Sequence, residues 1–98
     1  MNHSTMCRTV FSPYGPSKAA LESETVIWGQ NLHGTGVTVN ALPPGGATLT
    51  GMIPDAFPAI AREGLLDPGV MLPPLLWQVS SAADTISGCR VTGNQWDE

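Results

Sequence analysis

The sequence predicts an α/β fold consisting of two parallel strands with covering helices. Two observations lead to this prediction: apolar residues at helical spacing precede a short β-branched run across a brief connection, and a second β-branched run follows a later helical segment. An isolated two-stranded sheet is marginally stable in water, and parallel strands are normally buried inside larger sheets. We therefore expect the chain to be part of a larger α/β domain whose N-terminal half is absent.

The composition also indicates that the chain is part of a larger domain or assembly. Charged residues make up 12% of the 98 residues, whereas about 25% is typical of soluble domains. A small domain has proportionally more surface to solvate, so this deficit indicates that another chain, or the rest of a larger domain, covers part of the surface. The net charge of -4 argues against a nucleic-acid partner, and the sequence has no apolar run long enough to span a membrane.

The two cysteines, Cys7 and Cys89, are too few for a disulfide framework or a structural zinc site. The sequence does not open with a basic stretch followed by an apolar one, so it does not indicate a secretory signal. We therefore expect free thiols in a reducing cytoplasm, and no metal site.

We expect one domain, residues 1–98, made of five consecutive segments. Residues 1–11 show no period and are expected to be irregular. A helix lies within residues 12–34, and a strand and loop within 36–51. Residues 52–72 form a variable segment, and residues 73–98 contain a helix followed by a last strand.

The helix, from about Tyr14 to His33, is the most secure element. Ser12 is expected to cap it, Pro13 to take its first position and Gly34 to end it. One face carries an apolar stripe at helical spacing: Leu21, Thr25, Trp28 and Leu32.

Further elements follow from local patterns. The run 36–42 is expected to be a strand that two prolines halt, and 89–96 a second strand. Residues 55–63 are compatible with a short helix, 67–69 with a turn, and a helix is expected to begin at the prolines of positions 73 and 74.

The candidate chemistry lies in the single tyrosine and the single lysine, Tyr14 and Lys18, which are four residues apart. On a helix this spacing places the two side chains one above the other. A nearby ammonium group favours the phenolate, so such a phenol can donate a proton to a carbonyl or accept one from an alcohol near neutral pH. A simpler alternative is that Lys18 pairs with Glu22 and that Tyr14 packs over Pro13 and Pro16.

The run from Ser12 to Leu21 resembles the catalytic helix of the short-chain dehydrogenase/reductase family. The run from Gly36 to Gly46 is similar to the strand and the Pro-Gly cofactor loop of that family, in the same order. The resemblance implies a partial Rossmann-type fold and NAD(P)-dependent hydride transfer between an alcohol and a ketone. It also implies that residues 52–72 form the substrate lid.

By this resemblance Tyr14 is the acid/base and one of the cofactor-binding residues, and Lys18 assists it and binds the nicotinamide ribose. Pro44, Gly45 and Ala47 are expected to lie against the nicotinamide. Two threonines, Thr48 and Thr50, are candidates to contact the carboxamide or the phosphates of NAD or NADP, although they equally suit a role in capping the loop backbone.

Two family features are missing from the sequence. No glycine-rich turn for the pyrophosphate is present, and no serine stands at the expected distance before Tyr14. Ser4 is the nearest serine, but it lies too close and follows no strand. We therefore expect a fragment of an oxidoreductase that is inactive alone. The alternative is a non-catalytic module, or truncated pseudo-enzyme, that forms a homo-oligomer through residues 14–33.

Overall fold

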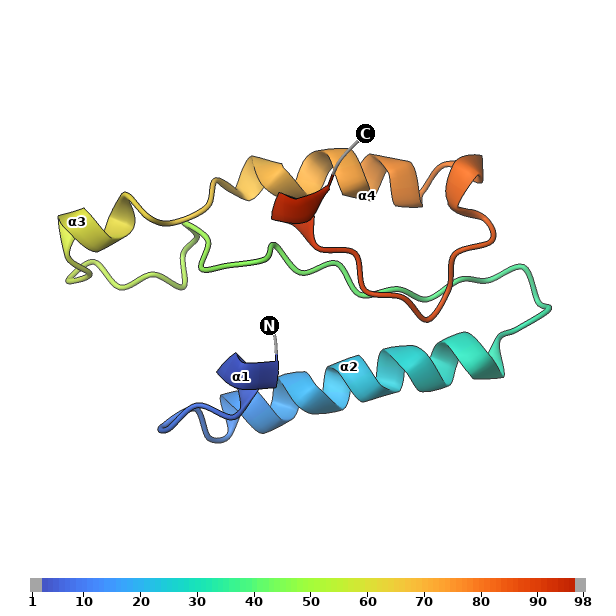
Figure 1. Ribbon diagram of the computed structural model, residues 1–98, viewed down its shortest axis with the longest axis horizontal. Coiled ribbons are helices and arrows are strands. Elements are labelled where there is room, and N and C mark those ends of the chain that lie inside the picture. The colour runs from blue at the N-terminus through green and yellow to red at the C-terminus, as the bar shows by residue number, and fades with distance from the viewer. Residues whose placement is uncertain (1–2, 97–98) are drawn as a thin grey trace.

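A computed structural model describes residues 3–96, so residues 1, 2, 97 and 98 of the expected segments lie outside the described part. Within this part the regular elements are helices (Figure 1). The α-helices are α1 (His3–Met6), α2 (Tyr14–Asn31), α3 (Ala59–Arg62) and α4 (Leu72–Gln78), and the 3₁₀ helices are η1 (Pro68–Met71), η2 (Ser81–Ala83) and η3 (Gly93–Gln95).

The predicted α/β fold with two parallel strands is wrong. Residues 36–42 and 89–96 contain no strand, and the second of these ranges includes η3. Two stretches of extended chain do lie side by side, but they share a single isolated parallel bridge, between Ala41 and Arg90. A second isolated bridge joins Thr48 to Leu66. The described residues therefore do not form a partial Rossmann-type sheet.

Proline and side-chain hydrogen bonds explain why the ladder does not extend. Pro43 and Pro44 follow the bridge and have no backbone N–H to donate. On the other side of the bridge, the N–H of Val39 donates to the Ser87 hydroxyl at 3.1 Å, and the N–H of Cys89 donates to Asn40 Oδ1 at 3.1 Å. Side chains thus replace the backbone partners that a regular ladder would use.

The extended segments run through the middle of the molecule. In Figure 1, α2 lies along one side of them with α1 beside its first turns, and α4 lies along the opposite side. The shape is elongated, with extents of 48 × 30 × 19 Å.

The prediction of the long helix is confirmed, with α2 covering Tyr14–Asn31. Pro16 lies in its first turn, where a missing N–H costs no helical hydrogen bond. The capping prediction is wrong, because Pro13 takes the N-cap position and the helix has no side-chain cap there. Gly34 has a φ of +83°, as a residue near a helix C-terminus often does, but the helix itself has already ended.

The expectation of an irregular N-terminus is wrong for His3–Met6, where α1 forms, whereas residues 7–11 contain no helix or strand. This short helix packs on α2 at Gly15, which is buried. A Cβ atom at this position would collide with the carbonyl oxygen of Met6, so glycine allows the two helices to approach this closely.

In the second half of the chain, the helices and the turn lie close to the positions predicted from the sequence. The helix expected within 55–63 is limited to α3, which begins after Pro58. The expected turn at 67–69 opens η1, where the Asp67 carboxylate accepts a hydrogen bond from Gly69 N–H at 2.7 Å. The helix expected at the paired prolines is α4, which begins one residue earlier, at Leu72.

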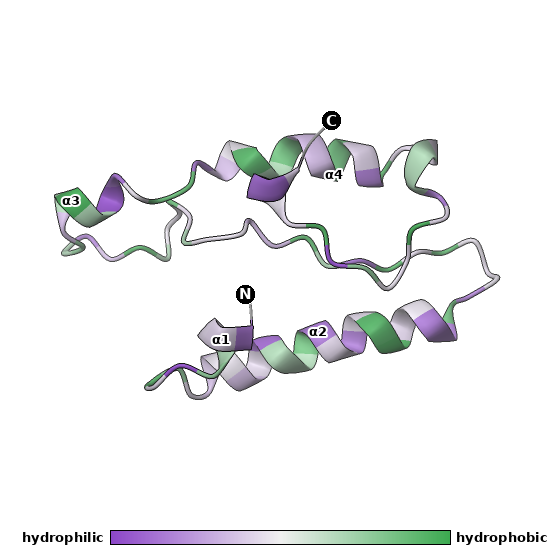
Figure 2. Cartoon of the chain, viewed as in Figure 1, coloured by the Kyte–Doolittle hydropathy of each residue, from purple (hydrophilic) through white to green (hydrophobic). Residues whose placement is uncertain are grey.

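Few side chains of the described residues are fully buried. Ala83 and Pro74 lie in the small apolar interior, and Thr25 is a buried polar residue. Many large apolar side chains are exposed instead, and Figure 2 shows hydrophobic residues along α4 and in the second half of α2. Within residues 3–96, no helix combines the length and the apolar character needed to cross a membrane.

A second close approach joins α2 to the extended chain. A Cβ atom on Gly29 would lie 2.9 Å from Gly88 Cα and 3.0 Å from its nitrogen, both of which are backbone atoms. The helix therefore comes near the extended segment at a point where neither residue has a side chain.

Alanine normally stabilises a helix relative to glycine by about 0.5–1 kcal/mol. We predict that Gly29→Ala does the reverse and lowers the free energy of unfolding by about 1–2 kcal/mol, because α2 must move away from Gly88. Urea denaturation followed by tryptophan fluorescence measures this change. Gly51→Ala is the control, since a Cβ atom at Gly51 meets no atom within 4 Å. A Gly29→Ala variant as stable as the parent would contradict the close approach.

Candidate active site

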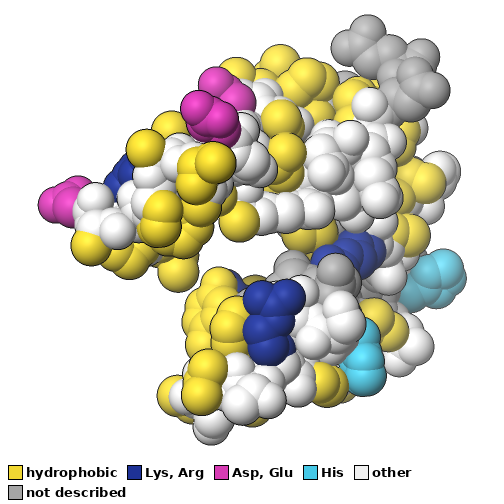
Figure 3. Space-filling view, turned by 60° about the vertical axis from the view of Figure 1, so that its left-hand side comes forward, with side chains coloured by type: hydrophobic (Ala, Val, Ile, Leu, Met, Phe, Trp, Pro, Cys, Tyr) yellow, Lys and Arg dark blue, Asp and Glu magenta, His cyan; other side chains and the backbone are white. Residues whose placement is uncertain are grey.

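A pocket of about 390 Å³ lies between α2 and the extended segment 40–44. Figure 3 shows a hollow on this side of the molecule, between the body with α3 and α4 and the body with α1 and α2. The helix contributes side chains from three successive turns, and the segment contributes five consecutive residues. The lining residues are Tyr14, Lys18, Leu21, Glu22 and Thr25, together with Asn40, Ala41, Leu42, Pro43 and Pro44.

Tyr14 and Lys18 meet as their spacing predicts. Lys18 Nζ lies 5.4 Å from the centroid of the Tyr14 ring, within cation–π range. The ring of Phe11 packs edge-on against the tyrosine, with centroids 6.4 Å apart. Tyr14 remains 41% exposed, so its phenol is accessible to a molecule that enters the pocket.

The alternative pairing of Lys18 with Glu22 is not the arrangement found. The Glu22 carboxylate lies 3.3 Å from Nη1 of Arg90. Arg90 belongs to the extended chain beside α2. Arg90 therefore draws this carboxylate toward the extended chain, and the ammonium group of Lys18 stays near the phenol. The ion pair also ties the middle of α2 to the segment that carries the Ala41–Arg90 bridge.

The other polar groups of the pocket are engaged within the protein. The Thr25 hydroxyl donates to the Leu21 carbonyl at 2.9 Å. The Asn40 amide donates to the Ile86 carbonyl at 3.0 Å and accepts from Cys89 N–H at 3.1 Å. A ligand would therefore meet the Tyr14 hydroxyl and the Lys18 ammonium as its main polar partners, beside a wall of leucine and proline side chains.

The predicted cofactor residues divide into two groups. Pro44 lines the pocket with Tyr14 and Lys18, and the neighbouring Pro43 is buried there. The other four residues, Gly45, Ala47, Thr48 and Thr50, are not part of its lining.

Gly45 has a φ of +98° and packs against the Asn94 side chain, which a Cβ atom would overlap. The Thr48 hydroxyl donates to the Gly46 carbonyl at 3.0 Å, and the Thr50 hydroxyl accepts from Met52 N–H at 3.3 Å. These bonds match the loop-capping alternative for both threonines.

Sequence reasoning did not single out Asn40 or Arg90 as site residues. Asn40 interrupts an apolar run, and this was the available signal that its side chain has a specific partner. The partner of Arg90 is far away in the sequence, so no local pattern points to the pair that it forms with Glu22.

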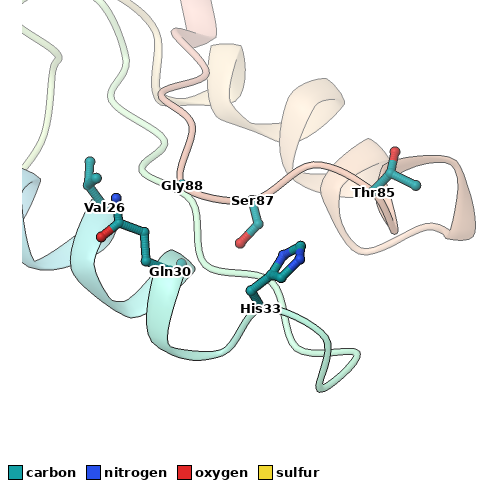
Figure 4. A pocket seen from close by; sticks show the side chains of 7 residues that line it. Val26, Gln30, His33, Thr85, Ser87 and Gly88 are labelled. Atoms are coloured by element: carbon teal, nitrogen blue, oxygen red, sulfur yellow. The ribbon is translucent and has the colours of Figure 1, made fainter.

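A larger pocket, of about 500 Å³, lies near the other end of α2 (Figure 4). Val26 and Gln30 reach it from the helix, His33 from the turn that follows, and Ser87 from the extended chain. None of the predicted site residues lies in it. We place the candidate site in the smaller pocket because that pocket contains the tyrosine and the lysine.

Comparison of the chain with family models, curated proteins and solved structures gives no match. Among residues 3–96, no group of three or more His, Cys, Asp or Glu side chains is arranged to hold a metal ion. The pocket itself is therefore the basis for inferring a function.

Proposed function

We propose that this chain carries the proton-transfer part of an NAD(P)-dependent oxidoreductase that interconverts an alcohol and a ketone. The observation that carries the proposal is that Tyr14, Lys18 and Pro44 share one pocket. Residues far apart in the sequence meet there, in the combination that the short-chain dehydrogenase/reductase resemblance implies. The two free, exposed cysteines fit a reducing cytoplasm, which we propose as the location.

The pocket fits one end of the dinucleotide. Lys18 offers N–H donors suited to ribose hydroxyls, and Leu42, Pro43 and Pro44 offer an apolar wall suited to a flat nicotinamide ring. A pyrophosphate normally needs backbone N–H groups at a helix N-terminus. Here Pro13 and Pro16 occupy the start of α2, and Lys18 is the only cation of the pocket lining. The pocket therefore suits the nicotinamide-ribose end and offers little to the phosphates.

In the direction of ketone reduction, the Tyr14 hydroxyl donates its proton to the carbonyl oxygen of the substrate. In the direction of alcohol oxidation, the Tyr14 phenolate accepts the hydroxyl proton. Lys18 stabilises the phenolate through its positive charge in both directions. A bound NAD(P)(H) supplies the hydride chemistry. Because the chain offers so little to the phosphates, we expect little or no turnover by the chain alone.

The binding test uses reduced nicotinamide mononucleotide and NADH, each followed through its own fluorescence. We predict similar Kd values for the two, on the order of a millimolar, because the adenosine half has no partner in the pocket. Lys18→Met should weaken both by about tenfold, the effect of losing one charge-assisted hydrogen bond. Tyr14→Phe should leave binding nearly unchanged, since the phenol acts on the substrate.

Arg62→Met is the control for the loss of a positive charge, because Arg62 bonds the Pro54 and Phe57 carbonyls outside the pocket. The proposal would be contradicted if neither nucleotide bound, or if Arg62→Met weakened binding as much as Lys18→Met.

Exposed apolar side chains of α2 support a second candidate function, association of two copies of the chain. Trp28, Val26 and Ile27 are each close to half exposed, and Leu21 is 53% exposed. The predicted stripe is divided, because Thr25 faces the interior while Leu21 and Trp28 remain accessible. Large apolar side chains gathered on an exposed helix are typical of surfaces that bind another protein.

Light scattering after size-exclusion chromatography tests the second candidate. We predict a dimer that Ile27→Asp converts to a monomer, because a buried carboxylate without a partner is costly at an apolar interface. Ile60→Asp is the matched control, since Ile60 is 81% exposed on α3. A wild-type chain that is monomeric at all accessible concentrations would rule out this function.

A further inference from the structure

The side chains of His3, the first residue of α1, and Cys7, the residue that follows α1, contact each other. The Cys7 N–H donates to the His3 carbonyl at 3.1 Å, which places the cysteine one helical turn after the histidine. The two side chains therefore lie on the same face, with Cys7 Sγ 3.8 Å from His3 Nε2. Both residues are exposed, so a small molecule can reach the sulfur.

The second cysteine has different surroundings. Cys89 is also exposed, but its Sγ lies 3.3 Å from the Ser87 carbonyl oxygen and donates to it. A carbonyl oxygen stabilises the protonated thiol and cannot remove its proton. The imidazole of His3, in contrast, is a base whose ring nitrogen lies within reach of the Cys7 thiol proton. The thiolate is the nucleophilic form of cysteine, so the two thiols should differ in reactivity although both are accessible.

We propose that Cys7 and His3 form a thiol–disulfide exchange site that takes low-molecular-weight disulfides. The Cys7 thiolate attacks one sulfur of the disulfide, a new S–S bond forms and the original S–S bond breaks. The departing thiolate takes the proton held by the His3 imidazolium. The incoming disulfide is the only oxidant, and Cys7 ends as a mixed disulfide. This site does not depend on the function proposed for Tyr14 and Lys18.

The experiment compares two single-cysteine variants of the full chain, Cys89→Ser and Cys7→Ser, in their reaction with the aromatic disulfide dithiobis(nitrobenzoic acid) at neutral pH. We expect the variant that retains Cys7 to react at least about fivefold faster than the variant that retains Cys89. Adding His3→Gln to Cys89→Ser should reduce the rate to near that of Cys89. Adding His33→Gln instead is the matched control and should leave the rate unchanged.

Two measurements show whether the reactivity of Cys7 depends on its pairing with His3 in the folded chain. In concentrated guanidinium chloride the His3 effect should disappear, because the helical turn that joins the pair is lost. With oxidised glutathione, mass spectrometry should find the mixed disulfide at Cys7 well before Cys89. Equal rates for the two cysteines in the native chain, or a Cys7 rate that His3→Gln leaves unaltered, would overturn the proposal.

Discussion

The arrangement of the described chain depends on the pairing of two extended segments, 39–44 and 86–94. Five backbone hydrogen bonds of 2.7–2.9 Å join them, donated by the N–H groups of Ala41, Gly88, Val91, Gly93 and Asn94. The Asn40 side chain adds two hydrogen bonds: its amide nitrogen donates to the Ile86 carbonyl, and its Oδ1 accepts from Cys89 N–H. Because α2 lies on one side of this pairing and α4 on the other, the pairing links elements from both halves of the sequence (Figure 1).

The candidate active site is a consequence of the same pairing. The backbone bonds place residues 40–44 opposite the first turns of α2, where they become the second wall of the pocket. The ion pair between Glu22 and Arg90 ties the helix to the paired segments and gives the Glu22 carboxylate a partner other than Lys18. The close approach of Gly29 to Gly88 brings the C-terminal end of α2 against the same paired segments.

Local features of the structure could be predicted from the sequence, and long-range features could not. The apolar spacing and Pro16 were enough to locate α2, and the spacing of Tyr14 and Lys18 was enough to place them on one face of it. The sheet was predicted from short β-branched runs, from the brief connection between helix and strand, and from the family resemblance. A regular strand also needs backbone partners along its length, and Pro43, Pro44 and the amide of Asn40 limit those partners to a single bridge.

The small interior explains why several expectations about loops and surfaces were incomplete. With few residues buried, the side chains of Thr48 and Thr50 satisfy their own loop backbone, and large apolar groups such as Trp28 stay accessible on α2. His3, in α1, and Cys7, directly after it, are four residues apart, but without a helical pattern around them the spacing carried no signal.

Amide hydrogen exchange measured by NMR tests the pairing of the two segments most directly. The account predicts that the N–H groups of Ala41, Gly88, Val91 and Gly93 exchange at least about a hundredfold more slowly than in an unfolded chain, and that Asn40→Ala reduces this protection at all four together. If these four amides exchange at the unfolded rate while α2 is protected, the segments do not pair, and the pocket that contains Tyr14 and Pro44 has no second wall.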